Sequence, residues 1–174
     1  MYALYAFCRR VDDIADGDWL PDLSDIGSEE MSDLEARTAD RSVILSIDKQ
    51  SEGSNPEPDH SLKLRALIHY RDMLTRANEG HSVSDPIFIA LKDTFNRFPI
   101  RVGDLHQLID GMEDDLYNNR YRTFDELYVY CYRVASVVGL MCIEIYGYDD
   151  PRARKFAESW GIFMQLTNVL RDVG

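Results

Sequence analysis

Two acidic side chains lie four residues apart in the stretch "FCRRVDDIAD" (7–16), whose other residues are typical of a buried helix. At about 100° per residue, four polar side chains fall within about 60° of one another on this helix: Tyr5, Arg9, Asp12 and Asp16. Two carboxylates one turn apart repel each other, whereas a shared divalent cation makes their proximity favourable. Mg²⁺ prefers carboxylate oxygens and bridges protein acids to substrate phosphates. Taken alone, the stripe is typical of a solvated helix face, and a site for a divalent cation is the alternative.

A second polar stripe runs along the last helix, in "WGIFMQLTNVLRD". Four residues share it, within about 60°: Gly161, Gln165, Asn168 and Asp172. Most of the remaining surface is apolar, which predicts that this helix is buried and that its polar stripe faces an interior cavity. Gly161 would let a ligand approach the backbone there. The alternative is a buried amide network that only fixes the register of the helix.

Asp115 and Tyr130 are two further candidates for chemistry. Asp115 follows Leu108 and Met112 at helical spacing, so it is predicted to lie on the inward face of its helix, whereas Asp110 and Asp114 point elsewhere. The alternative for Asp115 is a salt bridge or a helix cap. For Tyr130 it is a packed ring with a satisfied hydroxyl group.

The elements that must position these residues are all predicted to be helices, which makes the fold class all-α with roughly six helices. An acidic segment over about 17–61, rich in Ser, Gly and Pro, is predicted to be a long loop or insertion with one short helix near 29–39. Asp85 before Pro86, and Thr123 with Glu126, are expected to begin two of the helices. The predicted helices cover 1–16, 62–78, from Pro86 onward, 104–117, from Thr123 to about Tyr146, and from Pro151 to the end of the chain.

Charge and composition narrow the classes of function. The net charge of −12 disfavours nucleic acid and anionic lipid as partners. Cys8, Cys131 and Cys142 lie in apolar helical patterns without metal-ligand spacing, so we expect reduced core thiols. The N-terminus has no signal-peptide pattern, which favours a cytoplasmic protein or one that contacts a membrane only peripherally.

Four ordered motifs resemble the phytoene synthase and squalene synthase family: "LYAFCRRVDDIAD", "LIDGMEDDLYNNRY", "FDELYVYCYRVASVVGLM" and "QLTNVLRDVG". The resemblance covers nearly the whole chain outside the acidic segment, and "GLMCIEIYGY" looks most like bacterial presqualene diphosphate synthases and phytoene synthases. It implies an isoprenoid synthase-type helical bundle with two facing aspartate-rich helices around a central cavity.

The resemblance also implies roles for individual residues. Asp12 and Asp16 match the first metal motif, and Asn168 and Asp172 match the second, for Mg²⁺ with Mn²⁺ as the alternative. The substrate-binding side chains would be Tyr5, Arg9, Gln165 and Arg171, and the catalytic ones Tyr130 and Asp115. The second motif of the family closes with another Asp, which would fall at position 176. We therefore expect a partial synthase domain, incomplete at both ends, that is inactive as these 174 residues alone.

The activity that the resemblance implies is a head-to-head (1′-1) condensation of two prenyl diphosphates, giving presqualene diphosphate or squalene from farnesyl diphosphate, or phytoene from geranylgeranyl diphosphate. No NADPH site is expected in this segment, and peripheral membrane contact would serve release of an apolar product. Two alternatives stay open: a non-catalytic relative that acts as an assembly or scaffold factor, and a plain acidic helical interaction domain. The sequence does not specify the oligomeric state.

Overall fold

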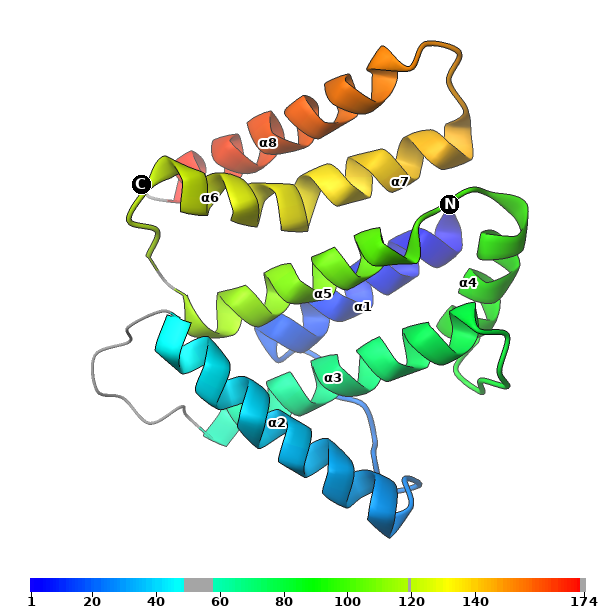
Figure 1. Cartoon of the computed structure of the whole chain (residues 1–174), viewed down its shortest axis with the longest axis vertical. Helices are drawn as coiled ribbons and strands as arrows, with labels where there is room; N and C mark the ends of the chain where they lie inside the picture. Colours follow the sequence, from blue (N-terminus) through cyan, green and yellow to red (C-terminus); the bar gives the residue numbers. More distant parts are fainter. Residues whose placement is uncertain (49–57, 119, 173–174) are drawn as a thin grey trace.

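The computed structural model describes residues 1–48, 58–118 and 120–172, and every regular element in them is a helix (Figure 1). The all-α prediction is confirmed. The elements are α1 (Tyr2–Asp16), α2 (Ser28–Asp48), α3 (Pro58–Asn78), α4 (Pro86–Arg97), α5 (Val102–Tyr117), α6 (Phe124–Cys131), the π-helix η1 (Tyr132–Ser136), α7 (Val137–Tyr146) and α8 (Arg152–Asp172).

The helices stack in layers around one long element. In Figure 1, α6, η1 and α7 follow one another as a continuous helix that lies between α8 above and α5 below. On its other side α5 packs against α1 and α3, and α2 lies outermost against α3. This order places α5 and the α6–α7 helix, which carry Asp115 and Tyr130, next to each other in the middle of the bundle.

Aromatic rings join α1, α3 and α4 into one core. Phe7, Tyr70 and Phe88 are at most 2% exposed. The rings of Phe7 and Phe88 meet edge to face with centroids 6.0 Å apart, and those of Tyr70 and Phe88 lie 5.1 Å apart. Such pairs add to the stability that area burial alone provides. They hold α1 with one face inward, so that the stripe on its adjacent face has a fixed direction.

The prediction of a loop over the acidic segment is wrong for much of its length. Residues 28–48 form the 21-residue helix α2, and α3 begins at Pro58 rather than near residue 62. Leu34 and Leu45 are buried on the inner face of α2. Arg37 donates two hydrogen bonds of 2.8 Å to Asp72 of α3. The short helix predicted near 29–39 lies within α2, which continues to Asp48. The sequence pattern does not predict this greater length, because an ion pair across two helices leaves no apolar period. Residues 49–57 of the predicted loop lie outside the described residues.

The predicted starts of α4 and α6 are confirmed. The Asp85 carboxylate accepts a hydrogen bond from the backbone N–H of Ile87 at 2.7 Å, directly before Pro86. The Thr123 hydroxyl accepts one from the backbone N–H of Glu126 at 3.2 Å. Both contacts satisfy N–H groups that a helix start otherwise leaves unpaired. The second cap fixes where the helix that carries Tyr130 begins.

The π-helix η1 lies between two glycines of neighbouring helices. A Cβ added at Gly111 of α5 would lie 2.7 Å from the Val134 side chain, and one added at Gly161 of α8 would lie 2.5 Å from Cα of Ser136. The wider turn of a π-helix fits here because neither neighbour has a side chain. The prediction that Gly161 admits a ligand is therefore wrong, since the backbone of Ser136 fills that space.

By length and composition alone, Phe124–Tyr146 could also cross a membrane, with 23 residues and a mean hydropathy of 1.4. In the fold this stretch is the central helix of the bundle and packs against α5 and α8. Its Arg133 forms an ion pair of 2.6 Å with Asp114 of α5. Of its most apolar 18-residue window, 28% is buried within the described residues.

Candidate active site

The polar stripe of α1 lies beside its buried face, as predicted. Arg9 donates a hydrogen bond of 2.9 Å to Asp12 and forms an ion pair of 2.7 Å with Asp13. Tyr5 and Asp16 are exposed, and the backbone carbonyl of Asp16 accepts a hydrogen bond from Nζ of Lys63 at 3.3 Å. The stripe thus combines one arginine with carboxylates on the exposed side of the helix that ends at Gly17.

The carboxyl group of Asp12 lies close to that of Asp16, so a negative charge on both groups is unfavourable. Burial raises the pKa of the Asp12 carboxyl, and the nearby Asp16 raises it further, while Arg9 lowers it. A divalent cation shared by these two carboxylates would remove the repulsion between them. Two carboxylates, with substrate phosphates and water completing the coordination, are the set of oxygen ligands that Mg²⁺ commonly accepts. The residues present therefore fit Mg²⁺.

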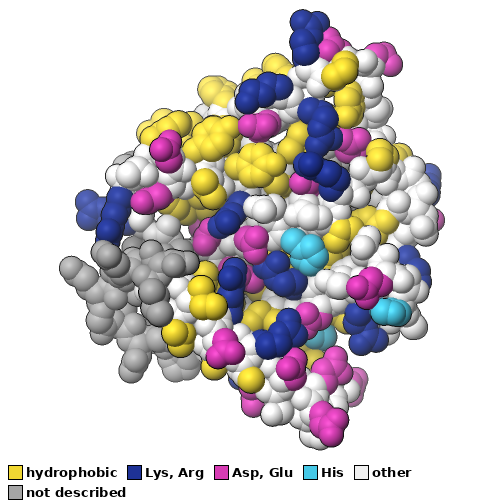
Figure 2. All heavy atoms as spheres, in the orientation of Figure 1, with side chains coloured by type: hydrophobic (Ala, Val, Ile, Leu, Met, Phe, Trp, Pro, Cys, Tyr) yellow, Lys and Arg dark blue, Asp and Glu magenta, His cyan; other side chains and the backbone are white. Residues whose placement is uncertain are grey.

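The polar stripe of α8 was predicted to face an interior cavity, but only part of it is half-buried and its C-terminal end is exposed. Gln165 and Asn168 are half-buried and linked by a hydrogen bond of 3.4 Å, whereas Arg171 and Asp172 are largely exposed and bond to each other at 2.9 Å. The expectation that the apolar side of α8 is buried is wrong: Trp160 is 54% exposed, within a group that also includes Phe156, Phe163, Met164 and Leu170. The reason is that α8 packs through its other side, against α6, η1 and α7. Figure 2 shows hydrophobic side chains gathered in this upper part of the molecule.

Tyr130 and Asp115, predicted separately, are in direct contact. The Tyr130 hydroxyl donates a hydrogen bond to Oδ2 of Asp115 at 3.1 Å. Burial is the largest cause that raises the pKa of the Tyr130 phenol, followed by the charge of Asp115, whereas a hydrogen bond with Gln165 lowers it. Gln165 therefore joins the stripe of α8 to Tyr130, and three of the predicted site residues form one cluster: Asp115, Tyr130 and Gln165.

The predicted direction of Asp115 is wrong in one respect. Asp115 is exposed, while Asp110 and Asp114, which were expected to point elsewhere, are more buried and ion-paired. The reason is that α3 and the π-helix η1 cover the sides of α5 that carry Asp110 and Asp114. Asp115 lies at the C-terminal end of α5, at the edge of the bundle, with its carboxylate turned toward Tyr130.

The two predicted metal motifs do not meet in the described part of the chain. Among residues 1–48, 58–118 and 120–172, no group of three or more His, Cys, Asp or Glu side chains lies close enough together to hold a metal ion. Asp12 and Asp16 are thus not joined there by Asp172 in one site. The structure forms the α1 stripe and the Tyr130 cluster as separate parts.

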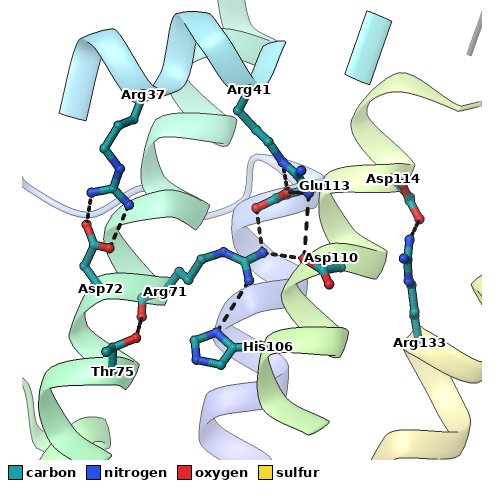
Figure 3. Close-up of polar contacts among 10 residues, drawn as sticks. All are labelled: Arg37, Arg41, Arg71, Asp72, Thr75, His106, Asp110, Glu113, Asp114 and Arg133. Carbon is teal, nitrogen blue, oxygen red and sulfur yellow. Dashed lines mark hydrogen bonds and ion pairs between the residues drawn. The ribbon is translucent and has the colours of Figure 1, made fainter. Parts of the chain in front are cut away.

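A buried ion network beside the site was not predicted. The Glu113 side chain, 1% exposed, accepts hydrogen bonds of 2.8 Å from Arg41 of α2 and from Arg71 of α3, and Arg71 also donates to Asp110 at 2.7 Å (Figure 3). These residues line a hollow of about 390 Å³ between the three helices. Each arginine is already paired with a carboxylate, so the network serves to attach α2 and α3 to α5, and Glu113 lies about one turn before Tyr117.

Comparison with known proteins decides the family. The model of the squalene/phytoene synthase family matches residues 1–174. The chain belongs to the squalene/phytoene synthase family. It is 33% identical to a phytoene synthase of Arthrospira platensis, over all of this chain and 48% of that protein. It is also 33% identical to the chloroplastic phytoene synthase 2 of Solanum lycopersicum, over all of this chain and 45% of that protein. The chain thus spans about half the length of these relatives.

Solved structures agree with the family at the level of fold. A dehydrosqualene synthase in complex with a ligand superimposes with a TM-score of 0.65 at 28% identity, over 99% of this chain and 46% of the other. A squalene synthase from Alicyclobacillus acidocaldarius gives a TM-score of 0.66 at 24% identity, over 99% and 49%. The predicted isoprenoid synthase-type bundle is confirmed for this family member.

Proposed function

We propose that the protein containing this chain condenses two prenyl diphosphates head to head. The observation that carries the proposal is the family match over all 174 residues together with the paired carboxylates of Asp12 and Asp16 on the exposed side of α1. Heterolysis of the C–O bond of one allylic diphosphate leaves its electron pair on diphosphate and forms an allylic cation. The alkene of the second substrate attacks this cation, and loss of a proton closes the cyclopropane ring of a cyclopropylcarbinyl diphosphate.

In this proposal Asp12 and Asp16 would hold Mg²⁺, or Mn²⁺ in its place, on α1, and Asn168 and Asp172 of the second motif would hold it separately on α8. When bound, the metal ion supplies positive charge for the departing diphosphate. Arg9 is 2.9 Å from Asp12, so its guanidinium can reach the same phosphate oxygens, and Tyr5 and Arg171 extend the binding surface along the two stripes. These side chains bind and orient the charged ends of the substrates.

Tyr130, Asp115 and Gln165 act at the hydrocarbon end. A tyrosine phenol is protonated at neutral pH and can donate a hydrogen bond, and burial and Asp115 raise the pKa of Tyr130 further. The face of its ring can stabilise the allylic cation, since aromatic faces attract positive charge. Asp115 holds the hydroxyl in place through the bond of 3.1 Å.

The chain length of the substrate belongs to the same proposal. The phytoene synthase relatives favour geranylgeranyl diphosphate, and the dehydrosqualene and squalene synthase structures favour farnesyl diphosphate. We propose a cytoplasmic protein that contacts a membrane peripherally when it releases its apolar product. Cosedimentation with neutral vesicles tests that contact.

A non-catalytic assembly factor is the less favoured reading, because it would not need repelling carboxylates at Asp12 and Asp16. The decisive experiment incubates the full-length protein with Mg²⁺ and either C15 or C20 diphosphate and identifies products by mass spectrometry. A head-to-head product that disappears on chelation supports the proposal, and the accepted substrate settles the chain length. No product from either substrate would refute it.

A further inference from the structure

Tyr121 lies in the loop between α5 and α6, at the end of the stretch "LIDGMEDDLYNNRY", and the sequence predicts no chemical role for it. Its ring stacks on that of Tyr130, with centroids 5.1 Å apart and planes at 29°. No other aromatic contact of Tyr130 is found in the described residues. The loop residue therefore covers one face of the ring whose hydroxyl bonds to Asp115.

The hydroxyl group of Tyr121 does not stabilise the fold through a hydrogen bond in the described part of the chain. It is buried, and within residues 1–48, 58–118 and 120–172 it has no hydrogen-bond partner. A buried hydroxyl without a partner is unfavourable for folding. Burial is the main cause that raises the pKa of Tyr121, and the nearby Asp115 and Tyr130 raise it further. The favourable contact of this residue with the cluster is thus made by its ring.

We propose that Tyr121 is a positioning residue for Tyr130: its stacked ring fixes the plane of the Tyr130 ring so that the hydroxyl stays on Asp115 and Gln165. The Tyr130 side chain has two rotatable bonds, and its two hydrogen bonds restrain only the hydroxyl end. A ring against its face restrains rotation about the remaining bond. The Tyr121 ring also excludes water from that side of the phenol. This inference rests on the proposed function, in which Tyr130 acts at the reacting carbons.

The test compares Tyr121→Leu with Tyr121→Phe in the full-length protein. Leucine removes the ring, and we expect kcat to fall about tenfold or more with KM nearly unchanged, because misplacing an oriented group acts on the chemical step. Phenylalanine keeps the ring, so kcat stays within about twofold of the parent protein. Tyr128→Phe, which removes a part-buried hydrogen bond to Glu158 and keeps the ring, is the matched control and retains full turnover.

A double mutant separates positioning through Tyr130 from a general packing role. In a Tyr130→Phe background, Tyr121→Leu should add less than about twofold to the loss, because the two residues act as one unit. Full additivity of the two losses would overturn the inference, as would a Tyr121→Phe variant as impaired as Tyr121→Leu. If Tyr121→Leu fails to fold, the turnover of Tyr121→Phe relative to the parent protein still tests the inference.

A second readout needs no turnover. With ¹³Cζ-labelled tyrosine, the pH titration of the Tyr130 signal, assigned through Tyr130→Phe, reports how well the ring is covered. In Tyr121→Leu the pKa of Tyr130 should fall toward that of free tyrosine, while in Tyr121→Phe it stays raised, since burial is the main cause of its shift. An unchanged pKa in Tyr121→Leu contradicts the inference. If the parent protein makes no product but this titration behaves as stated, the proposed function fails and the positioning contact stands.

Discussion

The hydroxyl of Tyr130 lies 3.1 Å from an oxygen of Asp115 and donates a hydrogen bond to it, which joins the start of the long central helix to the end of α5. Burial, and after it the charge of Asp115, raises the pKa of this phenol, which an ordinary tyrosine already keeps protonated at neutral pH. In the proposed reaction this excludes Tyr130 as a strong base at neutral pH and assigns it to hydrogen bonding and cation stabilisation.

Asp115→Asn should lower the pKa of Tyr130. The substitution removes the charge that disfavours phenolate, while burial, the larger cause, remains, so the pKa stays above that of free tyrosine. The ¹³Cζ titration of Tyr130 measures the change, and Asp125→Asn, an exposed acid at the start of α6, is the control. A Tyr130 titration identical in Asp115→Asn and in the parent would show that the carboxylate has no electrostatic role.

Asp12→Asn should make the protein more stable at neutral pH. The pKa of Asp12 is raised in the folded state, so the folded chain binds this proton more tightly than the unfolded chain does. Stability therefore falls as pH rises from the ordinary Asp pKa through the raised value, and the amide removes this loss. At a pH above the raised pKa, the thermal midpoint of Asp12→Asn should be higher than that of the parent protein. At a pH below the ordinary Asp pKa, the two midpoints should be equal. The exposed Asp93→Asn is the control, and a less stable Asp12→Asn at neutral pH would contradict the assignment.

Gly161→Ala should destabilise the protein by about 1–3 kcal/mol, because the new methyl group would meet the backbone of Ser136 at 2.5–2.6 Å. Gly103→Ala is the matched control: nothing lies within 4 Å of its added Cβ. Since alanine is the better helix former, this control should be neutral or more stable by up to about 1 kcal/mol. Urea denaturation measures both. Equal effects of the two substitutions would mean that α8 does not pack on η1 this closely.

Glu113→Gln should weaken the attachment of α2. The amide leaves Arg41 and Arg71 without the carboxylate that both contact, which lowers the free energy of unfolding by about 2–3 kcal/mol, less than for fully buried pairs because the arginines are partly exposed. Proteolysis within α2 should become faster. An exposed pair, Asp93 with Arg97, provides the comparison: Asp93→Asn should change stability by less than about 0.5 kcal/mol. A similar small effect of Glu113→Gln would show that α2 is held by its apolar residues alone.

Local signals in the sequence predicted much of the fold. The caps at Asp85 and Thr123 and the apolar period of α5 placed three helices close to where they lie. Helix α2 was mostly missed because charged contacts of Arg37 and Arg41 with other helices help to hold it, and such contacts depend on the tertiary fold. The π-turn of η1 depends likewise on the space beside two glycines of other helices.

The candidate site was predicted residue by residue but not as an arrangement. Helical spacing found Asp12, Gln165 and Tyr130, and resemblance to the family gave them roles. The contact between Tyr130 and Asp115 joins two helices across a loop, so no local pattern specifies it. Tyr121 closes the quoted stretch "LIDGMEDDLYNNRY", but its role was not predicted, because a loop residue has no periodicity and its stacking on Tyr130 is visible only in three dimensions.

The most direct test of the central claim, that Asp12 is a ligand for the metal ion that binds the prenyl diphosphate, is the Mg²⁺-dependent turnover of full-length Asp12→Asn beside Asp93→Asn. The account predicts that Asp93→Asn matches the parent protein, whereas Asp12→Asn loses about 100-fold or more in kcat while its circular dichroism and thermal midpoint show an intact fold. Turnover of Asp12→Asn within about twofold of the parent protein would contradict the account, because Asp12 would then lie outside the metal site.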